Sequence, residues 1–280
     1  MKPGFGKKGF EAHPSLNKAL GQVFLRQEWP CVKLTELLMR EGVSAVIEIG
    51  PGAGVLTKHL VSAGLHVTAV EKDTRFFNHL EEKKAVFGAD TSGSLEVINE
   101  DILNFDLESW VTETSEKRGK VAVCGNIPYN ISTPIVARVL SLLSSLEGAF
   151  FLVQLEFGQR VCSSKGSKNY GSLSVFSQLR SRAQLEFVVP RGCFYPVPKV
   201  DSAVISLKTP KKIYPEEILL KTETLTRQIF TQRRKKLSNA CKQFLEGKDL
   251  ERCPVDLSKR PDATSPSEFV DLAKFIYGLD

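Results

Sequence analysis

The sequence contains no uninterrupted apolar run long enough to cross a membrane. The apolar stretch at 148–153 is among the longest in the 280 residues, whereas a membrane-spanning helix needs about 20 such residues. The basic first residues are not followed by an apolar segment, so no secretory signal is expected. With 42% hydrophobic and 25% charged residues, we expect a soluble, cytoplasmic protein that makes no membrane contact.

The six cysteines are scattered along the chain. The Cys-x-x-Cys spacing is a common signature of zinc sites. No two of these cysteines have it. We therefore expect reduced thiols, no disulfide framework and no metal site. Internal repeats and low-complexity segments are also absent, and the composition excludes disorder, collagen and coiled coil.

Positive charge is in modest excess but unevenly distributed. The formal net charge is +6, and an acidic block at 41–154 lies between basic flanking segments. Two interpretations stay open. The flanks bind a polyanion such as nucleic acid, or the charges are solvated surface groups.

Short apolar runs rich in β-branched residues alternate with helical stretches over the first two thirds of the chain. A helix is predicted from Pro30, and another has Ile135, Val139, Leu142 and Leu146 at helical spacing. This alternation predicts an α/β fold with a doubly wound, mostly parallel sheet and helices on both faces. The expected strands are 45–49, 65–70, 95–98, 121–124, 149–153, 187–189 and 203–207.

After Pro210 the strand signals stop and helical patterns take over. We therefore predict a sheet domain at 1–210 and a small, all-helical domain at 211–280. The helices expected in the second domain are 216–230, 234–244 and 267–277.

A glycine-rich loop, Glu-Ile-Gly-Pro-Gly-Ala-Gly at 48–54, follows the first of these strands. Glycine lets a backbone approach a ligand closely. The dinucleotide fingerprint requires a third glycine where this chain has Val55. The tighter spacing Gly50-x-Gly52-x-Gly54 is similar instead to the loop of S-adenosylmethionine-dependent methyltransferases. A purely structural tight turn is the alternative.

Two acidic residues stand at the ends of the next two predicted strands. Glu71 ends the second strand, where a carboxylate can accept hydrogen bonds from both hydroxyls of a ribose. Asp101 follows the third, within reach of an adenine amino group if the sheet is parallel. Because open α/β sheets bind ligands at this edge, a nucleoside cofactor is favoured over helix caps or solvated acids.

The most specific motif is Asn126-Ile127-Pro128-Tyr129, at the end of the fourth predicted strand. It resembles the Asn/Asp-x-Pro-aromatic motif of methyltransferases that modify exocyclic amino groups of bases. If the Asn126 side-chain oxygen and the Ile127 carbonyl accept the two N–H groups of an adenine N6, the nitrogen lone pair points at a sulfonium methyl. Pro128 would fix that carbonyl, and Tyr129 would stack on a flipped base. A simple turn is the alternative.

With these motifs in view, the chain resembles the ribosomal RNA adenine dimethyltransferase family from Leu20 onward. That family combines a doubly wound, cofactor-binding sheet with a small helical domain. This arrangement agrees with the domain boundary predicted near residue 210. Further segments that carry the resemblance are Leu-Gly-Gln-Val-Phe-Leu at 20–25, Asn-Tyr-Gly-Ser-Leu-Ser at 169–174, Phe-Tyr-Pro-Val-Pro-Lys-Val-Asp-Ser-Ala at 194–203 and Phe-Thr-Gln-Arg-Arg-Lys at 230–235.

The resemblance implies site residues. Val23 stands where the family has Asn, so backbone or apolar contact is all that is expected of it. Phe194 is expected on the other face of the target adenine, with a core aromatic beside Pro196 and Pro198 as the alternative. The implied cofactor contacts are Val23, Leu25, Gly50, Gly52, Glu71, Asp101 and Asn126.

Four consecutive cations, Arg233, Arg234, Lys235 and Lys236, lie between helical stretches of the second domain. They are predicted to contact RNA phosphates, which positions an RNA without reading its sequence. A solvated helix start is the alternative.

Taken together, the resemblance implies a monomeric enzyme that uses S-adenosylmethionine to dimethylate N6 of two adjacent adenines. These lie in the 3′-terminal hairpin of 16S rRNA in the 30S subunit, so a role in ribosome biogenesis is expected. Two alternatives are a 23S rRNA adenine methyltransferase of the macrolide-resistance type and a non-catalytic RNA-binding assembly factor. The intact motif at 126–129 argues for catalysis.

Overall fold

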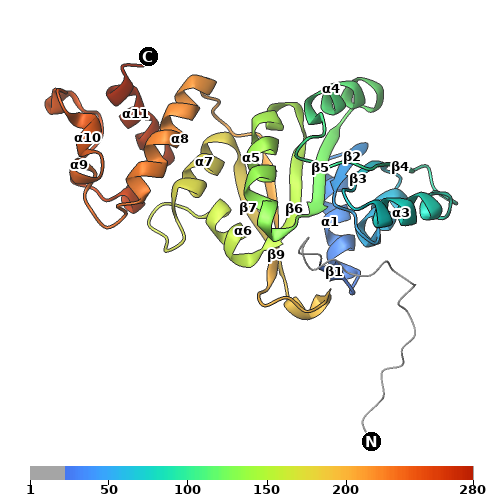
Figure 1. The fold of residues 1–280 in the computed structure, drawn as a ribbon. Helices are drawn as coiled ribbons and strands as arrows, with labels where there is room; N and C mark the ends of the chain where they lie inside the picture. Colours follow the sequence, from blue (N-terminus) through green and yellow to red (C-terminus); the bar gives the residue numbers. More distant parts are fainter. Residues whose placement is uncertain (1–22, 280) are drawn as a thin grey trace, which may run out of the picture. The chain divides into compact units, whose positions relative to one another are not determined.

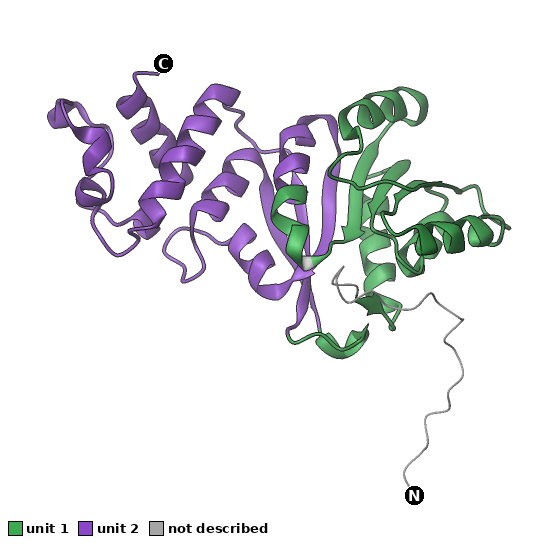
Figure 2. Cartoon of the chain, viewed as in Figure 1, with its two compact units in different colours: residues 1–135, 190–199 green, residues 136–189, 200–280 purple. Residues whose placement is uncertain are grey.

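The computed structural model describes residues 23–279 and confirms the α/β class, with strands alternating with helices (Figure 1). The chain divides into two compact units (Figure 2). Of the described residues, unit 1 comprises 23–135 and 190–199, and unit 2 comprises 136–189 and 200–279. This division is not the boundary at residue 210 that the sequence suggested, so that boundary stays a prediction.

Unit 1 contains four parallel strands in the order β4-β3-β2-β5. The side chains of β2 are all buried, as expected of a central parallel strand rich in Val and Ile. With β3 on one side of β2 and β5 on the other, β2 lies at a topological switch point, where such sheets bind ligands. The strands are β2 (Ala45–Ile49), β3 (His66–Val70), β4 (Ser94–Ile98) and β5 (Val121–Asn126), and the helices between and before them are α1 (Trp29–Arg40), α2 (Val55–Ser62), α3 (Thr74–Phe87) and α4 (Leu107–Arg118).

A second, two-stranded sheet in unit 1 joins segments that are far apart in the sequence. Its strands β1 (Phe24–Leu25) and β8 (Phe194–Tyr195) run antiparallel, and we call this pair the β1–β8 ribbon. The short 3-10 helix η4 (Arg191–Cys193) immediately precedes β8. Strands of two residues have no hydrophobic periodicity, so pattern analysis of the sequence could not find them.

Unit 2 begins within α5 (Ser132–Leu142) and contains three antiparallel strands in the order β6-β9-β7. These are β6 (Gly148–Gln154), β9 (Ser202–Lys208) and β7 (Arg182–Val189), and the helices are α6 (Leu155–Cys162), α7 (Ser172–Arg180), α8 (Glu216–Phe230), α9 (Leu237–Ala240), α10 (Lys242–Leu245) and α11 (Pro266–Tyr277). None of the helices in the described part of the chain is long and apolar enough to cross a membrane.

The C-terminal helices share a hydrophobic core with α7. Tyr170, just before α7, is buried in it and donates a hydrogen bond to the carbonyl of Thr264 at 2.9 Å. At the other end of α7, Arg180 donates two 2.7 Å hydrogen bonds to the Glu216 carboxylate at the start of α8. Because α7 precedes residue 210 yet packs with α8 and α11, this core extends across the boundary that the sequence suggested.

The helix predicted at 234–244 is wrong in its first three residues and is interrupted at Cys241. Lys236 is extended, and the backbone N–H groups of Leu237 and Ser238 donate to the carbonyls of Lys259 and Leu257 at 2.8 and 3.0 Å. These tertiary hydrogen bonds replace the ones a continuous helix would make. Two short helices, α9 and α10, result.

Candidate active site

A cavity of about 240 Å³ lies at the carboxyl ends of the strands of unit 1. Its walls come from the segments that follow β2, β3, β4 and β5, together with β1 and the residue before it. Every cofactor contact implied by the resemblance lines it: Val23, Leu25, Gly50, Gly52, Glu71, Asp101 and Asn126. The parallel sheet brings Gly50, Gly52, Glu71, Asp101 and Asn126 together because its strands all end at the same edge. Val23 and Leu25 belong to the segment of β1, which is not a strand of that sheet.

The glycine loop is held by close contacts that exclude side chains. Gly52 has φ +55°, a left-handed conformation that favours glycine. A Cβ at this position would lie 2.7 Å from Cε1 of Phe24, whose ring packs 5.2 Å from the ring of Phe76. Phe24 itself lines the cavity, so it forms a wall against which the loop is fitted.

Glu71 ties this loop to the end of β3. Its Oε2 accepts a 3.0 Å hydrogen bond from the N–H of Gly52, and its Oε1 accepts one of 2.8 Å from the N–H of Asp73. The residue is 6% exposed, and burial raises the pKa of its carboxyl, against the lowering effect of these hydrogen bonds. A carboxylate has about four acceptor positions, so Glu71 can still accept hydrogen bonds from ligand hydroxyls.

Asp101 is held by a cation and a backbone group. Lys72 Nζ donates to its Oδ2 at 2.8 Å, and the N–H of Leu103 donates to its Oδ1 at 3.0 Å. The hydrogen bond from Lys72, followed by that from Leu103, holds the pKa of this carboxyl below its usual value. Asp101 therefore carries a negative charge at neutral pH.

Glu48, in β2, also lines the cavity and was not assigned a role from the sequence. It is 1% exposed, and its Oε2 has no hydrogen-bond partner among the described residues. Burial, with a smaller contribution from the charge of Glu71, raises the pKa of this carboxyl to about 8. The signal was in the sequence, since Glu48 opens the glycine motif. A buried apolar strand cannot show from its sequence whether the one polar residue within it has a hydrogen-bond partner.

Asn126 is the last residue of β5 and faces the same cavity. A Cβ on the preceding residue, Gly125, would lie 2.5 Å from the carbonyl oxygen of Ile49, so glycine lets β5 approach β2 here. The Asn126 side chain donates from Nδ2 to the Val23 carbonyl at 3.0 Å. Ile127 and Pro128 follow it along the cavity wall.

The amino-acid sequence of the chain matches a known protein family. Residues 14–277 match the family described as ribosomal RNA adenine dimethylase. The chain belongs to this family. It is 36% identical to ribosomal RNA small subunit methyltransferase A of Francisella tularensis subsp. novicida, over 92% of this chain and 97% of that protein.

Two solved structures share the fold of this dimethylase. A dimethyladenosine transferase from Plasmodium falciparum matches with a TM-score of 0.68 and 22% identity, over 89% of this chain and 95% of that one. The 23S rRNA methyltransferase ErmE matches with a TM-score of 0.67 and 24% identity, over 91% and 99%. At these identities the likeness concerns the fold.

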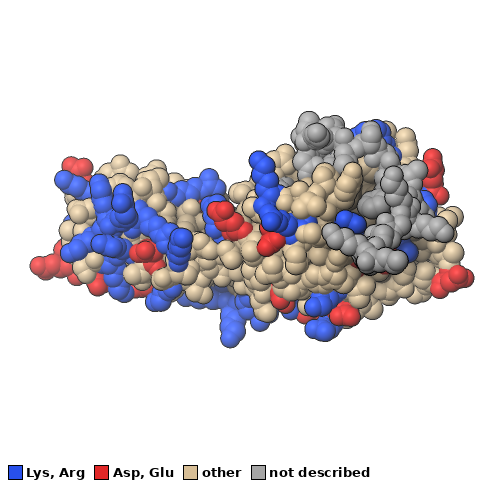
Figure 3. Space-filling model, turned by 90° about the horizontal axis from the view of Figure 1, so that it is seen from below, with Lys and Arg blue, Asp and Glu red and all other residues tan. Residues whose placement is uncertain are grey.

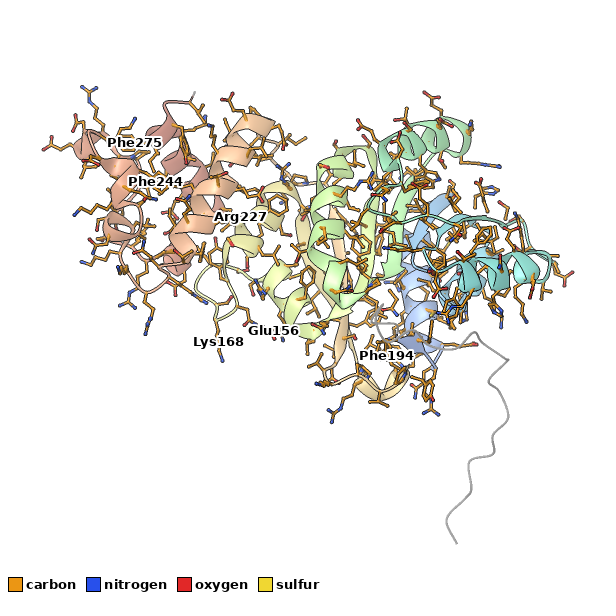
Figure 4. All side chains as sticks on the ribbon, viewed as in Figure 1. Glu156, Lys168, Phe194, Arg227, Phe244 and Phe275 are labelled. Atoms are coloured by element: carbon orange, nitrogen blue, oxygen red, sulfur yellow. The ribbon has the colours of Figure 1, made fainter. Side chains whose placement is uncertain are left out.

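Two other residues of the dimethylase, Phe194 and Tyr129, are predicted to contact the target base. Phe194 is 0% exposed in the β1–β8 ribbon and does not line the cavity (Figure 4). Its contact with a target base stays a prediction, and its burial matches the alternative of a core aromatic. Tyr129 begins a 3-10 helix, and its side chain lies outside the described part of the structure.

The predicted RNA-binding cations of the dimethylase lie in the turn between α8 and α9, in unit 2. Lys and Arg side chains gather on this part of unit 2 (Figure 3). Arg234, Lys235 and Lys236 are exposed. Arg233 is only half-exposed, and it donates to the carbonyls of Lys168 and Ser167 at 2.7 and 3.0 Å. Its Nε also lies 3.6 Å from Asp262, so this guanidinium is engaged within unit 2.

Proposed function

We propose that this dimethylase transfers methyl groups from S-adenosylmethionine to N6 of two adjacent adenines in the 3′-terminal hairpin of 16S rRNA. The product is N6,N6-dimethyladenosine in the 30S subunit, and the reaction belongs to small-subunit biogenesis in the cytoplasm. One observation carries the proposal: the Asn126–Pro128 segment and the implied nucleoside contacts line a single cavity.

The residues present fit the proposed cofactor. The N–H groups of the loop at 50–54 precede α2, and a helix N-terminus favours the carboxylate of an amino acid. Glu71 would accept hydrogen bonds from the ribose hydroxyls, and Asp101 would accept one from an adenine amino group. Oε2 of Glu48, which has no hydrogen-bond partner in the described part of the chain, offers a buried acceptor to the cationic part of the ligand. When bound, the cofactor supplies an electrophilic methyl group on a sulfonium.

The chain's own residues act on the target amine. The Asn126 Oδ1 and the Ile127 carbonyl would accept the two N–H groups of N6, which turns the nitrogen lone pair toward the methyl group. Pro128 restricts the backbone so that the Ile127 carbonyl keeps its direction. The carbonyl of Pro128 accepts from Ile131 N–H at 3.1 Å and from Ser132 Oγ at 3.2 Å, which anchors this segment to the start of α5.

Arg234, Lys235 and Lys236 would contact rRNA phosphates and orient the subunit, without reading its sequence. The enzyme is proposed to act as a monomer.

The test is methyl transfer from labelled S-adenosylmethionine to 30S subunits that lack the modification, with mass spectrometry of the nucleosides. We expect two methyl groups on each of the two adenines. Asn126→Ala should abolish transfer and retain binding to the subunit, whereas Asn78→Ala, at an exposed position on α3, should behave as the unmodified protein.

The other outcomes select other functions. Activity on 23S RNA with none on 30S subunits would indicate the macrolide-resistance type of enzyme. RNA binding without methyl transfer to either substrate would indicate a non-catalytic assembly factor. Transfer by Asn126→Ala within a few fold of the unmodified protein would refute the role given to that side chain.

A further inference from the structure

The Asn126 side chain has its orientation imposed by a backbone group. Its Nδ2 lies 3.0 Å from the Val23 carbonyl oxygen, 103 positions away in the sequence. A carbonyl oxygen only accepts hydrogen bonds, so the amide must present its NH₂ edge to Val23. Oδ1 then occupies the opposite edge of the amide, which is the edge left for an incoming N–H donor.

The Val23 carbonyl is in turn fixed by the β1–β8 ribbon. Phe24 pairs with Tyr195 and Leu25 with Phe194. The pairing continues beyond the two strands, because the N–H of Arg26 donates to the Cys193 carbonyl at 2.8 Å.

A second set of contacts, made by a side chain, holds the same segment. The Phe24 ring fits against the glycine at position 52 and lies 5.2 Å from the ring of Phe76. Val23 thus immediately precedes a residue that is held both by its backbone and by its ring. The segment cannot shift without disturbing the ribbon or this ring contact.

We propose that the Val23 carbonyl is a positioning group for methyl transfer, which holds Asn126 with Oδ1 available to the target amine. The inference rests on the proposed function. It also gives a physical reason why Val is tolerated where the family has Asn, since the backbone of residue 23 makes this contact and the side chain does not.

The variant Asn126→Asp tests this contact through pH. An ionised carboxylate has no donor, so it would face the Val23 carbonyl with an acceptor and lose the orienting bond. A protonated carboxyl can donate its O–H to Val23 and still accept from the amine with its other oxygen. An ionised carboxylate that faces the Val23 carbonyl oxygen in this part-buried position is destabilised, which should raise the pKa of the introduced carboxyl toward neutrality. The activity of N126D, divided by that of the unmodified enzyme at the same pH, should therefore rise about tenfold as the pH falls from 8 to 5.5.

Division by the unmodified enzyme removes the effects of other groups that titrate in both proteins. The titratable residues that line the cavity are Glu48, Glu71, Lys72, Glu100 and Asp101. A ratio that stays constant or falls as the pH is lowered overturns the inference. An unmodified enzyme with no methyl transfer to 30S subunits refutes the proposed function instead, so the two failures are distinguishable.

A matched pair of substitutions at Arg26 tests the ribbon. Arg26 is exposed, and its backbone N–H bonds to Cys193. Arg26→Pro removes this N–H and Arg26→Ala keeps it. Added to N126D, Arg26→Pro should abolish the recovery at low pH, and Arg26→Ala should preserve it. Thermal unfolding of each variant verifies that it is folded. Equal recovery in the two folded double variants would overturn the role of the ribbon.

Discussion

The N–H of Gly52 donates a 3.0 Å hydrogen bond to Glu71 Oε2, joining the glycine loop to the end of β3. The other oxygen of the same carboxylate accepts from Asp73 N–H at 2.8 Å. One buried side chain therefore both shapes the loop and faces the cavity. Shape and ligand contact are coupled at this residue, and substitutions here act on both.

Glu71→Gln should weaken S-adenosylmethionine binding by about tenfold or more. Its amide NH₂ would oppose either the Gly52 or the Asp73 N–H, and a hydrogen bond to a charged acceptor is worth about 1.5–3 kcal/mol. Isothermal titration of the cofactor measures the change. Glu96→Gln removes an exposed charge on β4 and serves as the control. Equal affinities of the two variants would contradict the role of Glu71.

Glu48 should make stability fall as the pH rises. Burial raises the pKa of its carboxyl from 4.5 to about 8, so between these values the folded chain keeps a proton that the unfolded chain releases. The free energy of unfolding therefore decreases with rising pH in this window, by up to about 1.4 kcal/mol per pH unit from this group.

Glu48→Gln should remove that dependence. Denaturant unfolding of both proteins at several pH values between 5 and 8 measures the difference in their free energies of unfolding. The variant should gain stability relative to the unmodified chain as the pH rises. Two parallel curves would mean that Glu48 is ionised in the folded protein.

Gly52→Ala should cost roughly 1–3 kcal/mol of unfolding free energy and also weaken cofactor binding. The new Cβ meets the Phe24 ring at 2.7 Å, and the φ of +55° is unfavourable for alanine. Gly171→Ala is the control, because it has an extended backbone and no atom within 4 Å of a new Cβ. Thermal unfolding and cofactor titration should separate the two variants. A similar loss in both would argue against the contact with Phe24.

Substitution of the neighbouring residues Arg233 and Arg234, in the turn after α8, should affect different properties: stability for Arg233 and binding to 30S subunits for Arg234. Arg233→Ala removes the guanidinium donor to the Lys168 and Ser167 carbonyls, of which the Ser167 carbonyl still accepts from the N–H of Tyr170 at 3.2 Å, and should lower the unfolding temperature. Arg234→Ala, at an exposed position, should leave that temperature unchanged. It should weaken binding to 30S subunits and reduce the slope of log affinity against log salt by about 0.7–0.9. An unchanged slope for Arg234→Ala would exclude it from phosphate contact.

Much of the α/β frame was predictable from local patterns. Strand 45–49 and helix 216–230 have the bounds that the sequence predicts, because β-branched runs and helical spacing act over a few residues. That Gly50, Glu71 and Asp101 line one cavity was predictable for a related reason. Residues that directly follow parallel strands gather at one edge of the sheet, so their positions depend on strand ends alone.

Contacts between distant segments were not predictable in this way. The β1–β8 ribbon and the bond from Asn126 to Val23 join residues more than one hundred positions apart. The two-residue strands carry no periodic signal, and the side chain of residue 23 says nothing about a contact that its backbone makes.

The sequence by itself determined the fold class, the strand ends and the residue types available at the cavity. Only the tertiary structure decided where individual side chains lie and what they contact: Glu48 Oε2 is buried without a partner among the described residues, Phe194 lies in the core, and Arg233 donates to two carbonyls. The physical reason is that spacing along the chain sets which groups can meet at an edge. Burial and hydrogen-bond partners are set by segments that arrive from elsewhere in the sequence.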